Sequence, residues 1–156
     1  MTMKIQIDYL ADHPELAETL AEWFYNEWGR SNPDSSPGKT RAWVRDHARR
    51  DALPLAVVAF VSGVPVGAAC IRAKDLASRP DLGPWLGSVY VVPDHRRRGI
   101  GRQLVGRAEA EAWRLGIKKL FLFTYDQEAL YASLGWSFVA HCENRGRPAV
   151  IMEKAV

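Results

Sequence analysis

The stretch VVPDHRRRGIGRQLV, residues 91–105, constrains this chain more than any other. Two valines end an apolar run, a proline and three arginines follow, and Gly99-Ile100-Gly101 opens a pattern with helical spacing. The first amides of a helix lack partners within the helix, and the helix dipole adds partial positive charge there. Glycines let an anion approach those amides closely. The stretch therefore predicts a strand, a phosphate-binding turn and a helix, with a di- or polyphosphate as the ligand.

Neither of two common phosphate motifs fits this turn. A P-loop needs Lys and then Ser or Thr after its last glycine, whereas Arg102-Gln103 follows here. A dinucleotide-binding turn needs a third glycine where Leu104 stands. A nucleic-acid patch is a further reading, but the formal net charge is only +3, which favours a local anionic ligand over a nucleic-acid partner.

The 156 residues suit one domain spanning residues 1–156. Periods of two and of 3.6 residues predict strands and helices in the order β-α-α-β-β-β-α-β-α-β-β. We expect strands at 4–9, 55–61, 64–72, 86–92, 117–124, 136–142 and 148–154, and helices at 14–28, 39–51, 100–115 and 127–134. This order predicts the α/β class, with a mixed sheet and one right-handed β-α-β crossover.

Several classes of protein are disfavoured. No stretch approaches the roughly 18–20 apolar residues of a membrane span, and the N-terminus turns acidic by Asp8 without an apolar segment typical of a secretory signal. Cys70 and Cys142 lack metal-ligand spacing, so we expect two reduced, buried thiols in a cytoplasmic protein. The four histidines are scattered, so we expect no metal site.

Two motifs carry a family resemblance. Arg96-x-x-Gly99-x-Gly101, after the strand VYVV, resembles the acetyl-CoA pyrophosphate loop of the GNAT superfamily of N-acetyltransferases. Tyr131-Ala-Ser-Leu-Gly135-Trp136 resembles the Y-x-x-x-G-[FY] element of that family, and the order of elements matches along nearly the whole chain. The resemblance implies a GNAT-like mixed sheet whose fourth and fifth strands splay apart, with acetyl-CoA as cosubstrate.

The resemblance also implies site residues. Backbone groups of two valines would pair with the pantetheine arm, and amides and arginines of the turn would bind the pyrophosphate. The family commonly has an Asn on the turn before the tyrosine helix; that Asn is absent here, and Asp126 of the same turn would make the contact instead. These cofactor-binding residues are Val91, Val92, Arg96, Arg97, Arg98, Gly99, Ile100, Gly101, Arg102 and Asp126. Tyr131 would be the catalytic acid, because a phenol with a pKa of about 10 is protonated at neutral pH and can donate to the departing thiolate. The amine would attack the thioester directly in a ternary complex.

One departure from the family concerns the base. Many members place a Glu on the fourth strand, whereas residues 85–89, WLGSV, contain neither a carboxylate nor a histidine. Glu27 or Asp126 could hold a relay water, and the base stays unassigned. The missing carboxylate supports an alternative, a non-catalytic acyl-CoA-binding regulatory module, and the retained Tyr131 opposes it.

The acceptor is left open as well. The runs TYDQEALY at 124–131 and HPEL at 13–16 resemble the branch of the family that contains the actin N-terminal acetyltransferase, which implies a peptide α-amine. An antibiotic, a polyamine or an amino acid fits the family equally. Tyr25, Asn26 and Glu27 lie off the apolar stripe of the first helix and could face an acceptor cleft. Many relatives pair as dimers, so the resemblance leaves a homodimer open.

Overall fold

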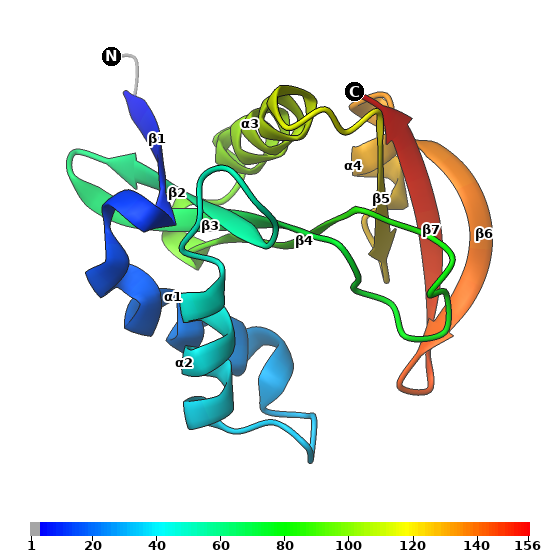
Figure 1. The fold of residues 1–156 in the computed structure, drawn as a ribbon, viewed down its shortest axis with the longest axis horizontal. Coiled ribbons are helices and arrows are strands. Elements are labelled where there is room, and N and C mark those ends of the chain that lie inside the picture. The colour runs from blue at the N-terminus through cyan, green and yellow to red at the C-terminus, as the bar shows by residue number, and fades with distance from the viewer. Residues whose placement is uncertain (1–3) are drawn as a thin grey trace.

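A seven-stranded mixed sheet in the order β1-β2-β3-β4-β5-β7-β6 forms the centre of the protein in a computed structural model, which describes residues 4–156 (Figure 1). Its strands are β1 (Ile5–Tyr9), β2 (Leu55–Val61), β3 (Val64–Arg72), β4 (Trp85–Val91), β5 (Lys119–Thr124), β6 (Ser137–Asn144) and β7 (Arg147–Ala155). The helices are α1 (Ala17–Phe24), α2 (Pro37–Asp46), α3 (Ile100–Arg114) and α4 (Glu128–Ser133). The predicted order of elements and the mixed α/β class are confirmed.

Helix boundaries differ from the predicted ones for local reasons. The predicted helix at 14–28 is composite, because a 3₁₀ turn at Pro14–Leu16 precedes α1 and a wide π turn at Tyr25–Gly29 follows it. The second helix begins at Pro37 rather than at 39, since the Ser36 side chain accepts a hydrogen bond from the Lys39 amide and caps the helix. It ends at Asp46 instead of 51.

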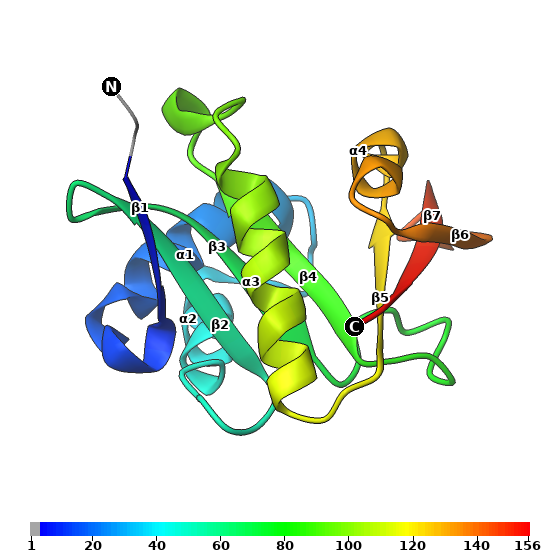
Figure 2. The ribbon, with the colours of Figure 1, turned by 90° about the horizontal axis from the view of Figure 1, so that it is seen from above.

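The helices cover both faces of the sheet (Figure 2). On one face α3 packs against strands β1 to β4 and buries a stripe with helical spacing; the stripe comprises Ile100, Leu104, Val105, Ala108 and Ala112. On the other face α1 and α2 bury Leu20, Phe24 and Val44 against β2 and β3. Because both faces are covered, β2 is buried along nearly its whole length.

The strands β4 and β5 diverge. They are parallel and pair only at Trp85 and Phe121, whereas β3 pairs with β4 and β5 pairs with β7 along most of their lengths. The divergence follows a bulge in β4 at Ser88, whose φ is 49° and where the register with β3 shifts. The predicted splay between the fourth and fifth strands is therefore confirmed, and it leaves one edge of β4 unpaired beyond Trp85.

Three further observations bear on the sequence expectations. Cys70 is buried, but Cys142 is half-buried, so the expectation of two buried thiols is wrong for Cys142; neither forms a disulfide. Within residues 4–156 no helix is both long and apolar enough to cross a membrane. In the same range, no group of three or more His, Cys, Asp or Glu side chains is arranged to hold a metal ion.

Candidate active site

The turn after β4 presents a set of free amides. A short 3₁₀ turn at Pro93–His95 and left-handed residues at Arg97 and Gly99 lead the chain into α3. In the described part of the chain, no backbone carbonyl accepts a hydrogen bond from the amides of residues 97–102. A Cβ added at Gly99 would meet nothing within 4 Å, so the space beside these amides is open. Open, unpartnered amides at a helix start suit an anion.

The arginines of this turn divide into two groups. Arg97, Arg98 and Arg102 are exposed, and none pairs with a carboxylate among residues 4–156. Arg96 turns back instead: its Nε donates to the Val91 carbonyl at 2.8 Å, and its guanidinium lies 5.5 Å from the Tyr90 ring centroid. Three arginines thus add uncompensated positive charge to the free amides, and together they fit a diphosphate.

The two valines predicted to bind pantetheine stand differently at the edge of β4. The Val92 amide donates to the Val66 carbonyl at 2.8 Å, and the Val92 carbonyl accepts from the His95 amide at 2.9 Å. Successive amides of a strand point to opposite edges, so the Val91 amide points into the splay. The edge therefore offers the Val91 amide, because the Val91 carbonyl already accepts from Arg96 and both backbone groups of Val92 are paired.

Tyr131 lies on α4 and packs against the same apolar cluster as Val89 and Val91. Its ring stands edge-on to Trp136, with 6.2 Å between the ring centroids. No group in residues 4–156 is hydrogen-bonded to its hydroxyl, and burial raises the pKa of Tyr131 to about 12. The phenol therefore keeps its proton at neutral pH and has that proton free to donate.

Asp126 and Glu27 occupy exposed positions. Asp126 lies in the short connection between β5 and α4, where the Gln127 amide donates to Thr124 Oγ1 at 3.0 Å. Because β4 and β5 are parallel, their carboxyl ends lie at the same edge of the sheet. That edge therefore carries the turn at 93–99, the start of α3, the connection that holds Asp126 and, after it, the helix α4 with Tyr131.

Aromatic side chains line the face of β4 opposite α3. Trp23 stacks on Tyr90 with 5.5 Å between ring centroids, and Trp28 meets the same ring edge-on at 6.2 Å. Tyr25 and Asn26 line a separate polar groove of about 530 Å³ between α1 and α2, which Glu27 does not line. Trp23 and Trp28, which are half-buried, thus pack against Tyr90 of β4 and also contribute to the core.

A buried polar cluster stands at the bulge of β4, and the sequence analysis did not find it. Arg72, at the end of β3, donates to His47 Nε2 at 3.0 Å, to Asp75 Oδ1 at 3.0 Å and to Ser88 Oγ. His47 Nδ1 donates to the Trp43 carbonyl at 2.7 Å, so its Nε2 is the acceptor and the ring is neutral. Burial and the Arg72 charge lower the pKa of His47 to about 4, which agrees with that neutral form.

The members of this cluster come from the residue that follows α2, from β3, from the 73–84 loop and from β4, so no local pattern joins them. One signal does point there: Gly87 interrupts an apolar strand, and a glycine inside a strand marks a bulge or a close approach. Here the close approach is that of the Arg72 and Asp75 side chains.

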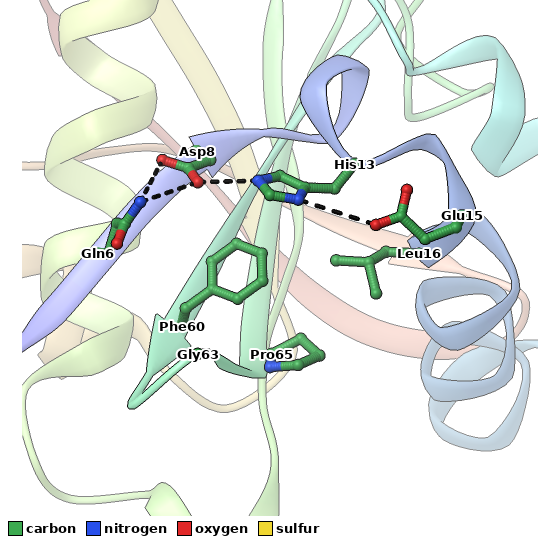
Figure 3. Close-up of a pocket in the computed structure, with 8 residues that line it drawn as sticks. All are labelled: Gln6, Asp8, His13, Glu15, Leu16, Phe60, Gly63 and Pro65. Atoms are coloured by element: carbon green, nitrogen blue, oxygen red, sulfur yellow. Dashed lines mark hydrogen bonds and ion pairs between the residues drawn. The ribbon is translucent and has the colours of Figure 1, made fainter.

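Figure 3 shows a second pocket, beside β1. It measures about 270 Å³ and is lined by residues of β1, the turn after it and the β2–β3 hairpin, among them Asp8, His13 and Phe60. His13 Nε2 lies 2.8 Å from Asp8 Oδ2, and this hydrogen bond lowers the pKa of Asp8. β1 is an edge strand of the sheet, and β2 and β3 separate it from β4. The pocket is therefore remote from the splay between β4 and β5.

Comparison with known proteins places the chain in a family. Residues 14–136 match the model of the Acetyltransferase (GNAT) family. The chain is 30% identical over 130 residues to N-alpha-acetyltransferase 80 of Mus musculus, a match that covers 79% of this chain and 38% of the mouse protein. The chain thus spans well under half the length of that relative.

Solved structures share the fold. An aminoglycoside 6'-N-acetyltransferase complexed with coenzyme A superposes with a TM-score of 0.74 at 19% identity, covering 96% of each chain. An acetyltransferase from Salmonella typhimurium with its cofactor acetyl-CoA has a TM-score of 0.75 at 21% identity, covering 97% of this chain and 93% of the other. Since the family match spans most of the sequence and the splayed sheet agrees with it, this chain belongs to the Acetyltransferase (GNAT) family.

Proposed function

We propose that this chain, as a single domain of residues 1–156, is an N-acetyltransferase that moves an acetyl group from acetyl-CoA to a primary amine. The observation that carries the proposal is the splay of β4 and β5, which opens beside the unpartnered amides of residues 97–102. Arg97, Arg98 and Arg102 add positive charge that no carboxylate in residues 4–156 neutralises. Membership of the Acetyltransferase (GNAT) family supports the same reaction class.

Acetyl-CoA supplies the activated acetyl group as a thioester. The amides of Gly99, Ile100 and Gly101 would hold its pyrophosphate, and the three unpaired arginines would add charge-assisted hydrogen bonds. The Val91 amide, which points into the splay, would pair with the pantetheine arm, and Asp126 would contact that arm from the turn after β5. Together these contacts would hold the thioester in place for attack.

In this proposal Tyr131 acts as the general acid. Burial keeps its hydroxyl protonated, and that hydroxyl is not hydrogen-bonded to any group in residues 4–156. It is therefore free to give a proton to the sulfur as charge develops there, which contributes roughly 10²–10⁴-fold to such steps. The Tyr131 hydroxyl also argues against a module that only binds acyl-CoA.

A peptide α-amine is the acceptor class with the most support. The curated relative is an N-alpha-acetyltransferase, and its similarity extends over 130 residues. The runs at 13–16 and 124–131 agree with that class. The aminoglycoside enzyme shares the fold at only 19% identity, so an aminoglycoside serves as the competing acceptor in the test.

A thiol-release assay with acetyl-CoA tests this function. The acceptors are a short peptide with a free N-terminus, the same peptide with a blocked N-terminus, a blocked peptide that contains lysine, and an aminoglycoside. We expect thiol release with the free N-terminus alone, with the acetylated peptide identified by mass spectrometry. Release with the aminoglycoside alone would move the acceptor to that class. Tight binding of acetyl-CoA without release for any amine would replace the enzyme with a binding module.

A further inference from the structure

The face of β4 opposite α3 carries no acidic side chain next to the splay, and Gly87 shows why one would not fit. A Cβ added at Gly87 would lie 2.6 Å from Arg72 Nη1 and 2.7 Å from Asp75 Oδ2. The space that a side chain of β4 would enter is thus already filled. It holds a carboxylate that the 73–84 loop brings from outside the strand. Gly87 is two residues beyond Trp85, the last position at which β4 pairs with β5.

We propose that Asp75 is the general base of this enzyme, which takes the proton from the acceptor ammonium either directly or through one water. The assignment rests on the proposed acetyl transfer. Residues 85–89 of β4 contain no carboxylate. The assignment places the carboxylate of the site on the loop beside this strand instead.

The contacts of Asp75 leave one oxygen for this role. Its Oδ1 accepts from Arg72 Nη1 at 3.0 Å, while Oδ2 has no hydrogen-bond partner among residues 4–156 and is the oxygen next to Gly87. The side chain is 19% exposed, so a water molecule or an amine can reach it. Arg72 is itself held by His47 and Ser88, so the carboxylate sits on a rigid support.

The electrostatic surroundings suit a base. Burial raises the pKa of Asp75, and the Arg72 guanidinium offsets part of that rise. The other titratable groups of the cluster are His47, directly after α2, and Cys70 of β3. His47 has a pKa of about 4, and burial raises the pKa of the Cys70 thiol, so both are uncharged at neutral pH. A carboxylate with a raised pKa accepts a proton more readily than an exposed one.

The proton balance closes with groups already assigned. Asp75 takes one proton from the acceptor ammonium and later releases it to solvent. The neutral nitrogen forms its bond to the acetyl carbon, and the carbon–sulfur bond breaks with its electron pair on sulfur. Tyr131 gives its proton to that sulfur, and the second proton lost by the nitrogen restores the phenol through solvent. The products are the acetylated amine, the CoA thiol and one proton.

The test compares Asp75→Asn with Asp81→Asn, a matched change in an exposed ion pair on the same loop. We expect Asp75→Asn to lower kcat about 10²–10⁴-fold at neutral pH. The deficit should shrink as the pH rises and free amine accumulates, while calorimetric affinity for acetyl-CoA stays that of the wild type. Asp81→Asn should retain the wild-type kcat and pH profile.

Two outcomes overturn the assignment. One is an Asp75→Asn enzyme with a kcat close to that of the wild type; the other is a deficit that stays constant with pH, because that pattern means Asp75 only positions Arg72. A wild type that releases no thiol with any amine contradicts the acetyltransferase proposal itself, so the two failures are distinct.

A measurement on the wild-type enzyme tests the assignment even if the Asp75→Asn variant does not fold. The acid limb of kcat/KM for the amine and the ¹³C shift of the Asp75 carboxyl should titrate together. A separation of more than about one pH unit overturns the role of Asp75.

Discussion

In the proposed mechanism the acid step depends on Tyr131, whose ring is packed against Trp136 while its hydroxyl has no hydrogen-bond partner in residues 4–156. Tyr131→Phe removes that hydroxyl and little else. We expect kcat to fall by about 10²-fold or more, with calorimetric affinity for acetyl-CoA unchanged. A kcat within a few-fold of the wild-type value would mean that the sulfur takes its proton elsewhere.

His47 links the stability of the protein to pH. Burial and the Arg72 charge lower its pKa from 6.5 to about 4, so between these values the unfolded state binds a proton that the native state does not. The contribution to stability is therefore full above pH 6.5 and falls as the pH drops through that window, by up to about 1.4 kcal/mol per pH unit. Urea unfolding at several pH values checks this slope. His47→Gln should flatten the slope, and equal slopes in both proteins would contradict the assignment.

At the residue scale, the sequence predicts only those site residues that belong to a local motif. Tyr131 and the glycines of the turn are predicted as site residues because each motif lies within one segment of the sequence. The cluster of Arg72, His47 and Asp75 is not predicted by the sequence, because these side chains meet only when separate elements pack. The paired backbone of Val92 could not be foreseen either, since it depends on the register between β3 and β4.

Among the elements, α3 is attached to β1 by the buried Glu111 carboxylate and by Arg107, which donates to the Ile7 carbonyl at 2.7 Å. Glu111 of α3 accepts hydrogen bonds from the Tyr9 hydroxyl at 2.6 Å, from Arg107 at 3.0 Å and from Arg114 at 2.9 Å. Burial alone would raise the pKa of Glu111, but these donors outweigh it, and the pKa is lowered. The cluster therefore joins two elements that the sequence places far apart.

Replacing Glu111 with Ala removes the acceptor that Tyr9, Arg107 and Arg114 share, although Arg107 keeps the Ile7 carbonyl and Arg114 keeps Asp51. We expect a loss of about 1–3 kcal/mol in the free energy of unfolding at neutral pH, measured with urea, because buried donors lose their acceptor. Because the folded pKa lies below the ordinary 4.5, the stabilisation is present above that pH and fades as the pH falls below it. Glu22→Ala, at an exposed position of α1, should change the stability by no more than about 0.5 kcal/mol. Equal effects of the two changes would contradict the importance of the cluster.

Element boundaries were predictable where alternation and turn chemistry agree. The observed bounds of β2 and β3 are the predicted ones, since two apolar runs flank the tight turn Ser62-Gly63. The bounds of α2 were not predicted correctly, because Ser36, which caps the helix, lies within a run of Ser, Pro and Gly that is typical of a loop. Propensity alone does not show which of several serines will cap a helix.

Across the whole molecule, the sheet consists of two parts joined mainly at Trp85 and Phe121. The order of elements and the splay could be predicted from the two motifs, because the family resemblance carries the topology with it. The bulge at Ser88, and with it the entry of Asp75 beside Gly87, is a consequence of long-range strand register. That register is decided only when all the strands have formed.

The central claim is that the opening between β4 and β5 and the turn that follows β4 bind acetyl-CoA. Calorimetric titration of acetyl-CoA tests it on the wild type, on the double variant Gly99→Glu, Gly101→Glu, and on Gly106→Ala, a control at an open position of α3. We predict binding to the wild type and to Gly106→Ala, and its loss in the double variant, whose carboxylates would repel the pyrophosphate. A wild type that does not bind acetyl-CoA, or a double variant that binds it equally well, would contradict the account.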